Sequence, residues 1–108
     1  MNFDEYQTQA SKTTIYDDKY NIIYPSLGLV NEAGEVAGKV KKVLRDNGGI
    51  FGTLEREAIK KELGDVLWYM SAVCSDLNIN MSDVAQANID KLNSRLTRGV
   101  LGGSGDER

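Results

Sequence analysis

The 108-residue sequence contains no histidine, one cysteine and one proline. Without histidine, the chain has no Ser-His-Asp or Cys-His catalytic group and no histidine-based metal site. The single Cys74 excludes an intramolecular disulfide, a CxxC redox centre and a cysteine zinc site. Any catalysis must therefore come from carboxylates, lysine, arginine, tyrosine, serine or threonine, and any metal must be held by oxygen.

The charge and hydropathy patterns of two further protein classes are also missing. The 13 basic and 16 acidic residues give a net charge of −3, which argues against a duplex-binding protein, because such proteins usually carry a basic face. No apolar run approaches the roughly 18 residues of a membrane span. The polar residues 1–10 are unlike a secretory signal. With 41% hydrophobic residues, the composition is that of a single globular domain, and we expect it in the cytoplasm.

Four segments carry the apolar spacing of amphipathic helices, and none alternates convincingly with the period of a strand. The expected helices cover about residues 3–12, from Pro25 or Ser26 to Asp46, from about Thr53 to Asn78, and from Asn80 or Ser82 to the residues before Gly99. The pattern predicts an all-α, four-helix bundle-like domain over residues 1–100.

The remaining segments are expected to be irregular. Residues 13–24 are polar and rich in tyrosine, and they predict a loop with a short turn, in which Tyr20–Tyr24 is the stretch nearest to a strand. The turn Asp46-Asn47-Gly48-Gly49 ends the second helix. Residues 101–108 form a glycine-rich tail, for which a frayed end is the simplest expectation.

Two acidic pairs stand on the second and third predicted helices. Glu32 and Glu35 lie three residues apart, as do Glu62 and Asp65, so each pair shares one helix face. Like charges at this spacing disfavour a helix by roughly 0.2–0.5 kcal/mol per pair, and a divalent cation between facing pairs would offset this. An all-oxygen site suits Mg²⁺, with Mn²⁺ as a substitute, and Mg²⁺ commonly also binds phosphate oxygens. The pattern predicts metal-assisted hydrolysis or phosphoryl transfer on a phosphorylated substrate.

The alternative interpretation is a solvated surface, because acidic residues at this spacing are common on helices. Lys39 and Lys61 each lie four residues from one member of a pair, so ordinary surface ion pairs would explain half of the set. The repetition of the pattern favours a metal site, since each of the two acidic pairs encloses a glycine, Gly34 in one and Gly64 in the other. A helical glycine costs about 1 kcal/mol relative to alanine, which indicates a close approach of backbone or ligand at both places.

Around these residues the sequence resembles the MazG-like, all-α nucleoside triphosphate pyrophosphohydrolases. The matching motifs are Glu32-Ala33-Gly34-Glu35 and Glu62-Leu63-Gly64-Asp65, separated by residues 36–61, and residues 87–95 are also similar. The resemblance covers about residues 3–100. It implies an all-α fold with the site between the second and third helices. The implied reaction splits a nucleoside triphosphate between the α and β phosphates, giving monophosphate and pyrophosphate.

The resemblance also implies roles for the four acidic residues. Glu32, Glu35, Glu62 and Asp65 would bind Mg²⁺. Because the chain has no histidine to act as base, a carboxylate must help to activate the attacking water, and Glu35 and Glu62 are the leading candidates.

Further residues are implied to contact the substrate. Asn88 and Lys91 match positions that contact phosphate or sugar, and Arg95 is a further candidate on the same face of the fourth helix. Trp68 could stack on a base, although a tryptophan in such a helix is more often a core or interface residue. The tail resembles the ends of some short family members, which implies ordering over the phosphates through a backbone anion-binding nest.

The resemblance further implies a homo-oligomer, a dimer or a tetramer, in which helices of two subunits build one site. The wide apolar stripe of residues 63–77 also indicates an oligomer, because its burial requires more surface than the other helices of one chain offer. The leading interpretation is an enzyme that clears nucleoside triphosphates from the nucleotide pool. Two alternatives stay open: a narrow dCTP or dUTP pyrophosphatase on the same fold, and a non-catalytic helical interaction module with solvent-facing acidic pairs.

Overall fold

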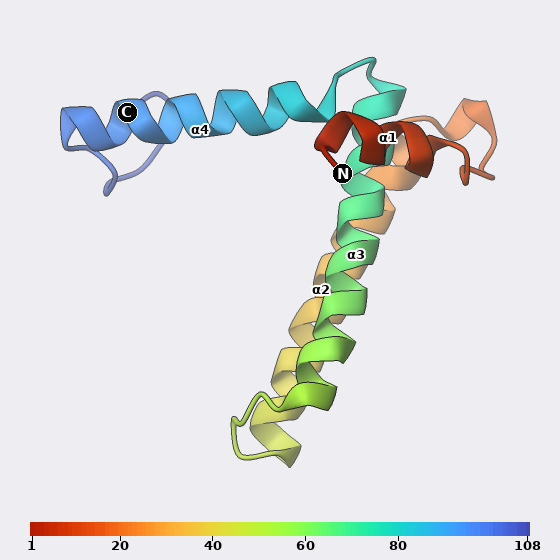
Figure 1. Cartoon of the computed structure of the whole chain (residues 1–108), viewed down its shortest axis with the longest axis vertical. Helices are drawn as coiled ribbons and strands as arrows, with labels where there is room; N and C mark the ends of the chain where they lie inside the picture. Colours follow the sequence, from red (N-terminus) through yellow and green to blue (C-terminus); the bar gives the residue numbers. More distant parts are fainter.

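The computed structural model describes all 108 residues and is entirely helical (Figure 1). Its elements are α1 (Phe3–Ser11), the short 3-10 helix η1 (Asp18–Tyr20), α2 (Ile23–Asp46), α3 (Thr53–Asp76) and α4 (Met81–Arg98). The predicted all-α class with four α-helices is confirmed. None of the helices combines the length and the apolar character that crossing a bilayer requires.

Helices α2 and α3 lie side by side over most of their length and form the centre of the molecule (Figure 1). Each has 24 residues. In the connecting turn, Gly48 and Gly49 have φ angles of 60° and 76°, which glycine adopts without steric cost. The Asn47 N–H and the Gly49 N–H both donate to the Val43 carbonyl, which attaches the glycine turn to the end of α2. The predicted glycine turn is therefore confirmed.

Helix α2 begins at Ile23, before the predicted start at Pro25 or Ser26, so Pro25 lies within the first turn, where a missing N–H removes no helical hydrogen bond. The preceding residue, Ile22, has a φ of 71°, which is rare for a β-branched residue. Its N–H donates to Asp76 Oδ2 at 2.8 Å, and the Ile23 N–H donates to the Asn21 carbonyl, which closes a tight three-residue turn. This turn starts the helix early.

Helix α1 holds the turn between α3 and α4. The Gln7 side-chain amide donates to the Ile79 carbonyl at 2.8 Å and accepts from the Met81 N–H at 2.8 Å. The N-cap residue of α4 is Asn80, but its side chain makes no capping hydrogen bond. The side-chain hydrogen bond at the start of α4 therefore comes from Gln7 on α1, and not from Asn80, one of the two residues at which the sequence placed the start of this helix.

Helix α4 projects away from the α2–α3 pair, and its first turns lie against α1 (Figure 1). The radius of gyration is 16.8 Å, against about 13 Å for a compact chain of this length. The accessible surface is 7746 Å², against about 5,900 Å² for a compact monomer of this mass. Only seven of the 108 residues are buried, and large apolar side chains such as Val30, Leu63 and Leu96 are exposed. A single chain therefore leaves apolar helix faces uncovered.

The C-terminal tail is folded, and the expectation of a frayed end is wrong. The chain reverses at Gly99, whose φ is 72°, and returns along α4 (Figure 1). The guanidinium groups of Arg95 and Arg108 donate to carbonyls of the tail. The glycine content alone suggested mobility, but these arginine donors hold the segment in place.

Gly28 permits the close approach of α2 to α3. A Cβ atom at this position would overlap the ring of Tyr69, whereas nothing lies within 4 Å of a Cβ at Gly34, Gly38 or Gly64. The close approach of backbone expected at Gly34 and Gly64 is therefore found at Gly28 instead.

We predict that Gly28→Ala lowers the free energy of unfolding by about 1–3 kcal/mol, because the new methyl group must displace the Tyr69 ring. The matched control on the same helix is Gly38→Ala, which meets no atom and gains helix propensity, and we expect no loss of stability there. Urea denaturation of the two variants and the wild type measures both effects. Equal stability of Gly28→Ala and the wild type would contradict this account of the packing.

Candidate functional site

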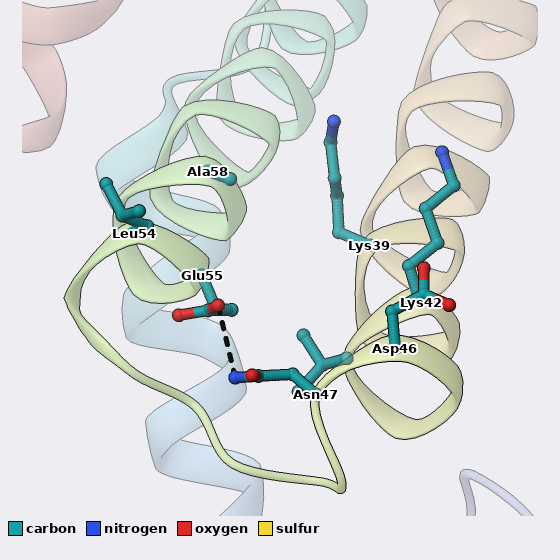
Figure 2. A pocket seen from close by; sticks show the side chains of 8 residues that line it. Lys39, Lys42, Asp46, Asn47, Leu54, Glu55 and Ala58 are labelled. Atoms are coloured by element: carbon teal, nitrogen blue, oxygen red, sulfur yellow. Dashed lines mark hydrogen bonds between the residues drawn. The ribbon is translucent and has the colours of Figure 1, made fainter.

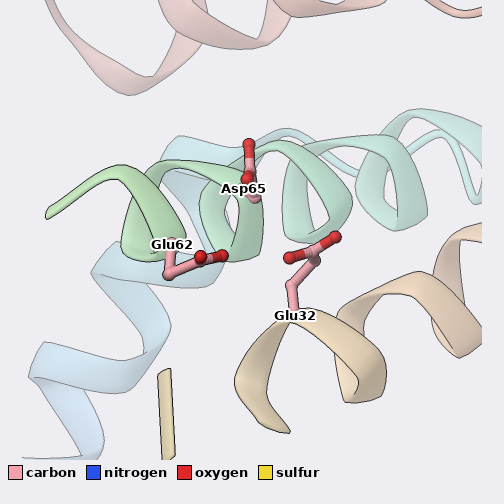
Figure 3. A group of neighbouring side chains, drawn as sticks. All are labelled: Glu32, Glu62 and Asp65. Carbon is pink, nitrogen blue, oxygen red and sulfur yellow. The ribbon is translucent and has the colours of Figure 1, made fainter. Parts of the chain in front are cut away.

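The α2–α3 pair brings three of the four predicted carboxylates together. One carboxylate oxygen each from Glu32, Glu62 and Asp65 lies within 4.8 Å of the other two. Figure 3 shows Glu32 on α2 reaching across toward Glu62 on α3, with Asp65 on the neighbouring turn of α3. Glu32 and Glu62 are half-buried. We call this group the acidic cluster.

Glu35, the fourth predicted ligand, lies one turn beyond Glu32 on α2 and is exposed. It stands outside the acidic cluster, although its charge contributes to the raised pKa of Glu32. Lys39, which could have paired with Glu35 on the helix surface, instead reaches across to α3. Its Nζ atom lies 3.9 Å from Glu62 Oε1, so an ammonium group borders the cluster.

Desolvation and the neighbouring negative charges both disfavour the ionised form of Glu32 in the acidic cluster. The pKa of Glu32 is raised by desolvation, by the charges of Asp65, Glu62 and Glu35, and by a hydrogen bond with Glu62. A raised carboxyl pKa means that the folded protein disfavours the ionised form. A bound cation would remove this penalty, and an all-oxygen donor set fits a hard divalent ion such as Mg²⁺ or Mn²⁺.

An aromatic pocket of about 400 Å³ opens beside the acidic cluster. Glu32 and Asp65 form part of its wall, and the rest consists of Thr13, Ile15, Tyr16, Tyr24, Trp68 and Tyr69. The rings of Tyr16 and Tyr24 stack with centroids 4.8 Å apart, and Trp68 meets Tyr69 edge-on at 5.0 Å. Flat apolar rings and carboxylates thus share one pocket, a combination that fits an aromatic ring next to a carboxylate-bound cation.

Two hydrogen bonds attach the loop before α2 to α3 and complete the pocket wall. Trp68 Nε1 donates to Thr13 Oγ1 at 2.8 Å, and the Tyr16 hydroxyl donates to Asp76 Oδ2 at 2.8 Å. Burial raises the pKa of Tyr16, and the hydrogen bond to Asp76 and its charge raise it further, so the hydroxyl remains a donor. Sequence patterns did not predict this wall, and the tyrosine-rich composition of residues 13–24 was the one signal for it.

The remaining predicted site residues fall into two groups. Trp68 is half-buried and lines the aromatic pocket. Asn88, Lys91 and Arg95 lie on α4, and none of them lines that pocket. Because α4 projects away from the α2–α3 pair, one protomer does not bring these three residues to the acidic cluster (Figure 1).

A second cavity, of about 340 Å³, lies at the turn between α2 and α3 (Figure 2). Lys39 and Lys42 extend along one side, and the Asn47 amide donates to Glu55 Oε1 at 3.1 Å on the other. This hydrogen bond links the end of α2 to the first turn of α3 across the connecting turn. The cavity wall holds no group of converging carboxylates, so it offers no alternative to the acidic cluster.

Comparison with known proteins identifies the family. A model of the MazG nucleotide pyrophosphohydrolase domain matches residues 26–99. The chain belongs to this family. It is also 46% identical to the "Gene 37 protein" of Mycobacterium phage L5 over an alignment of 114 positions that covers both chains in full. No solved structure matches the chain at a significant level. The region matched by the MazG model contains the acidic cluster and the whole of α4.

We predict that Mg²⁺ raises the melting temperature of the protein at neutral pH, because it binds the native acidic cluster and not the unfolded chain. Asp65→Asn should lose most of this increment. Glu57→Gln is the matched control, since Glu57 lies on the same helix, is exposed and borders Lys60 instead of the cluster. Thermal unfolding with Mg²⁺ and with a chelator measures the increment.

The sign of the pH dependence follows from Glu32. Because its folded-state pKa is raised, its ionisation destabilises the metal-free protein as the pH rises through that pKa. Glu32→Gln should therefore stabilise the metal-free protein at pH 7 and lose this advantage in acid.

Equal melting temperatures with and without millimolar Mg²⁺ would count against the metal site.

Proposed function

We propose that this protein hydrolyses ribo- or deoxynucleoside triphosphates at the α phosphate, releasing monophosphate and pyrophosphate, with Mg²⁺ as cofactor and Mn²⁺ as a substitute. The observation that carries the proposal is the shared wall of Glu32 and Asp65, which belong both to the acidic cluster and to the aromatic pocket. Membership of the MazG family supports the reaction class. The proposed role is the clearance of nucleotides from the cytoplasmic pool.

The proposed metal ligands are Glu32, Glu62 and Asp65, with Glu35 as the fourth. A bound Mg²⁺ supplies positive charge for the phosphate oxygens and lowers the pKa of a bound water. The proton of the attacking water must pass to a carboxylate because the chain has no histidine. Glu35 and Glu62 are the residues we propose for this step. Removal of either should act on turnover, since the interaction strengthens as charge develops in the transition state.

The proposed nucleoside site is the aromatic pocket. Trp68 and the stacked Tyr16 and Tyr24 offer ring faces for a base, beside the carboxylates that would hold the metal and the phosphate chain. The hydrogen bonds from Trp68 to Thr13 and from Tyr16 to Asp76 fix the pocket wall before any ligand binds. A panel of nucleotides assayed for pyrophosphate release separates a broad enzyme from one restricted to dCTP or dUTP.

We also propose that the catalytic unit, residues 1–100, is a homo-oligomer, either a dimer or a tetramer. The accessible surface exceeds that of a compact monomer by about 1,800 Å², and a standard interface covers about 800 Å² per partner. Assembly would also let α4 of one protomer approach the α2–α3 pair of another. Asn88, Lys91 and Arg95 would then contact the phosphates or the sugar.

The oligomeric state is measured directly by light scattering coupled to size-exclusion chromatography. We expect a molar mass near two or four times 11.9 kDa at micromolar concentration, because a lone chain leaves so many apolar side chains in water. A mass of one chain at this concentration would reject the assembly.

Hydrolysis in H₂¹⁸O tests the site of attack. Attack at the α phosphorus places the label in the monophosphate, and attack at the β phosphorus places it in pyrophosphate. Glu62→Gln should lower kcat by orders of magnitude, because it removes both a metal ligand and a proposed proton acceptor. Glu57→Gln again serves as the control and should retain turnover, since Glu57 is exposed outside the cluster.

Three results would contradict the proposal. Label found only in pyrophosphate would exclude attack at the α phosphate. Undiminished turnover in Glu62→Gln would exclude the assigned role of this residue. Failure of every nucleotide to release pyrophosphate would favour the non-catalytic interaction module.

A further inference from the structure

The carbonyl groups of the C-terminal tail are turned toward two arginine side chains. Arg108 donates to four carbonyls, those of Gly105 at 2.6 Å, Leu101 at 3.0 Å, Gly102 at 3.0 Å and Val100 at 3.2 Å. Arg95 Nη2 donates to the Asp106 carbonyl at 2.8 Å. The tail is therefore a closed loop built around guanidinium groups.

The main-chain N–H groups of the same loop have no partners. No backbone N–H between Leu101 and Glu107 donates to another backbone carbonyl. Gly103 and Gly105 have φ angles of 97° and 85°, values that glycine adopts readily and other residues avoid. A short turn of successive free N–H groups around left-handed residues is the geometry of an anion-binding nest.

The segment that carries the loop is basic, although the whole chain has a net charge of −3. Residues 91–108 contain four basic and two acidic side chains. One of the acidic groups, Asp106, is already neutralised, since its Oδ1 lies 3.2 Å from Lys91 Nζ and 3.5 Å from Arg95 Nη2. Lys91 and then Arg95 hold the pKa of Asp106 below its usual range. Arg98 Nη2 donates to the main-chain oxygen of Arg108 at 2.9 Å, and neither Arg98 nor Arg108 pairs with a carboxylate side chain.

Arg95 provides an independent observation. Only 5% of this residue is exposed, and its Nε atom is the buried side-chain polar atom without a hydrogen-bond partner. A buried donor without an acceptor costs free energy. The acceptors of the tail therefore do not saturate the guanidinium group, and Arg95 retains a donor for a further acceptor.

We propose that residues 103–106 form a phosphate-binding loop, in which main-chain N–H groups and the basic face of α4 hold a phosphate group together. The ligand class is a pyrophosphate or the polyphosphate chain of a nucleotide. This assignment deepens the proposed function and rests on it for the identity of the natural ligand. Lys91 belongs to the same face, so the loop and α4 would bind the phosphate end of the substrate as one surface.

Inorganic pyrophosphate, added without metal to the full chain, is the probe. We expect isothermal titration calorimetry to detect binding to the wild type. Gly105→Ala should weaken the affinity about tenfold, the factor that matches the cost of a left-handed conformation for a residue with a side chain. A Cβ at Gly105 meets nothing within 4 Å, so the change acts on the backbone conformation alone.

Gly102→Ala is the matched control. It adds the same methyl group to the same tail, outside residues 103–106, at a residue without a left-handed φ and with no atom within 4 Å. Its affinity should equal that of the wild type. Arg108→Gln is a second route to the same effect, because it removes the donors that hold the carbonyls, and it should also weaken binding. Circular dichroism confirms that the helices of each variant are intact.

Equal affinity of the wild type, Gly105→Ala and Arg108→Gln would overturn the proposal, as would no binding at millimolar pyrophosphate. The outcome is separable from that of the proposed function. If no nucleotide is hydrolysed, binding of pyrophosphate that depends on Gly105 still supports the loop. If nucleotides are hydrolysed but neither the KM nor pyrophosphate affinity changes in Gly105→Ala, the loop assignment fails and the hydrolase stands.

Discussion

The packing of α2 against α3 positions most of the groups that this protein offers for chemistry. Because Gly28 carries no side chain, the Tyr69 ring lies directly against the α2 backbone. This approach places Glu32 opposite Glu62 and Asp65, where desolvation and then the neighbouring carboxylates raise the pKa of Glu32. The helix pair therefore stores an electrostatic penalty that a divalent cation would relieve. The aromatic pocket depends on the same contact, since its wall includes Tyr69.

Asp76, at the end of α3, holds the segment before α2 in place through hydrogen bonds. Its Oδ2 atom accepts hydrogen bonds from the Tyr16 hydroxyl and from the Ile22 N–H, both at 2.8 Å. One carboxylate at the end of α3 thus fixes the loop that closes the pocket and the unusual backbone of Ile22. In contrast to the acidic cluster, this carboxylate is satisfied by donors of the chain itself, and its role is structural.

Local sequence patterns predicted much of the structure. The i, i+3 spacing of Glu32 with Glu35 and of Glu62 with Asp65 placed each pair on one helix face, and Gly48 and Gly49 marked the turn between the helices. The class of the fold followed from the apolar spacing. Since helix spacing is a local property, these features required no knowledge of tertiary contacts.

Features that depend on long-range contacts could not be predicted from local sequence patterns. The cap of α4 comes from Gln7, which lies 74 residues before Met81. The tail is ordered by Arg95 and Arg108, whose carbonyl partners have no sequence signature. The direction of α4 also could not be read, because its apolar face fits a neighbouring helix of the same chain or of another protomer equally well.

The protein carries an acidic cluster on α2 and α3 and a basic surface on α4 and the tail. In the proposed function, the acidic cluster binds the metal and the basic surface binds the phosphates. The central claim of this proposal is that the acidic cluster binds a divalent ion at the edge of the aromatic pocket. Trp68 is the single tryptophan, so its indole N–H gives one NMR signal from that pocket. Addition of Mn²⁺ should broaden this signal in the wild type and leave it sharp in Asp65→Asn. A Trp68 signal that stays sharp in the wild type at saturating Mn²⁺ would contradict the claim.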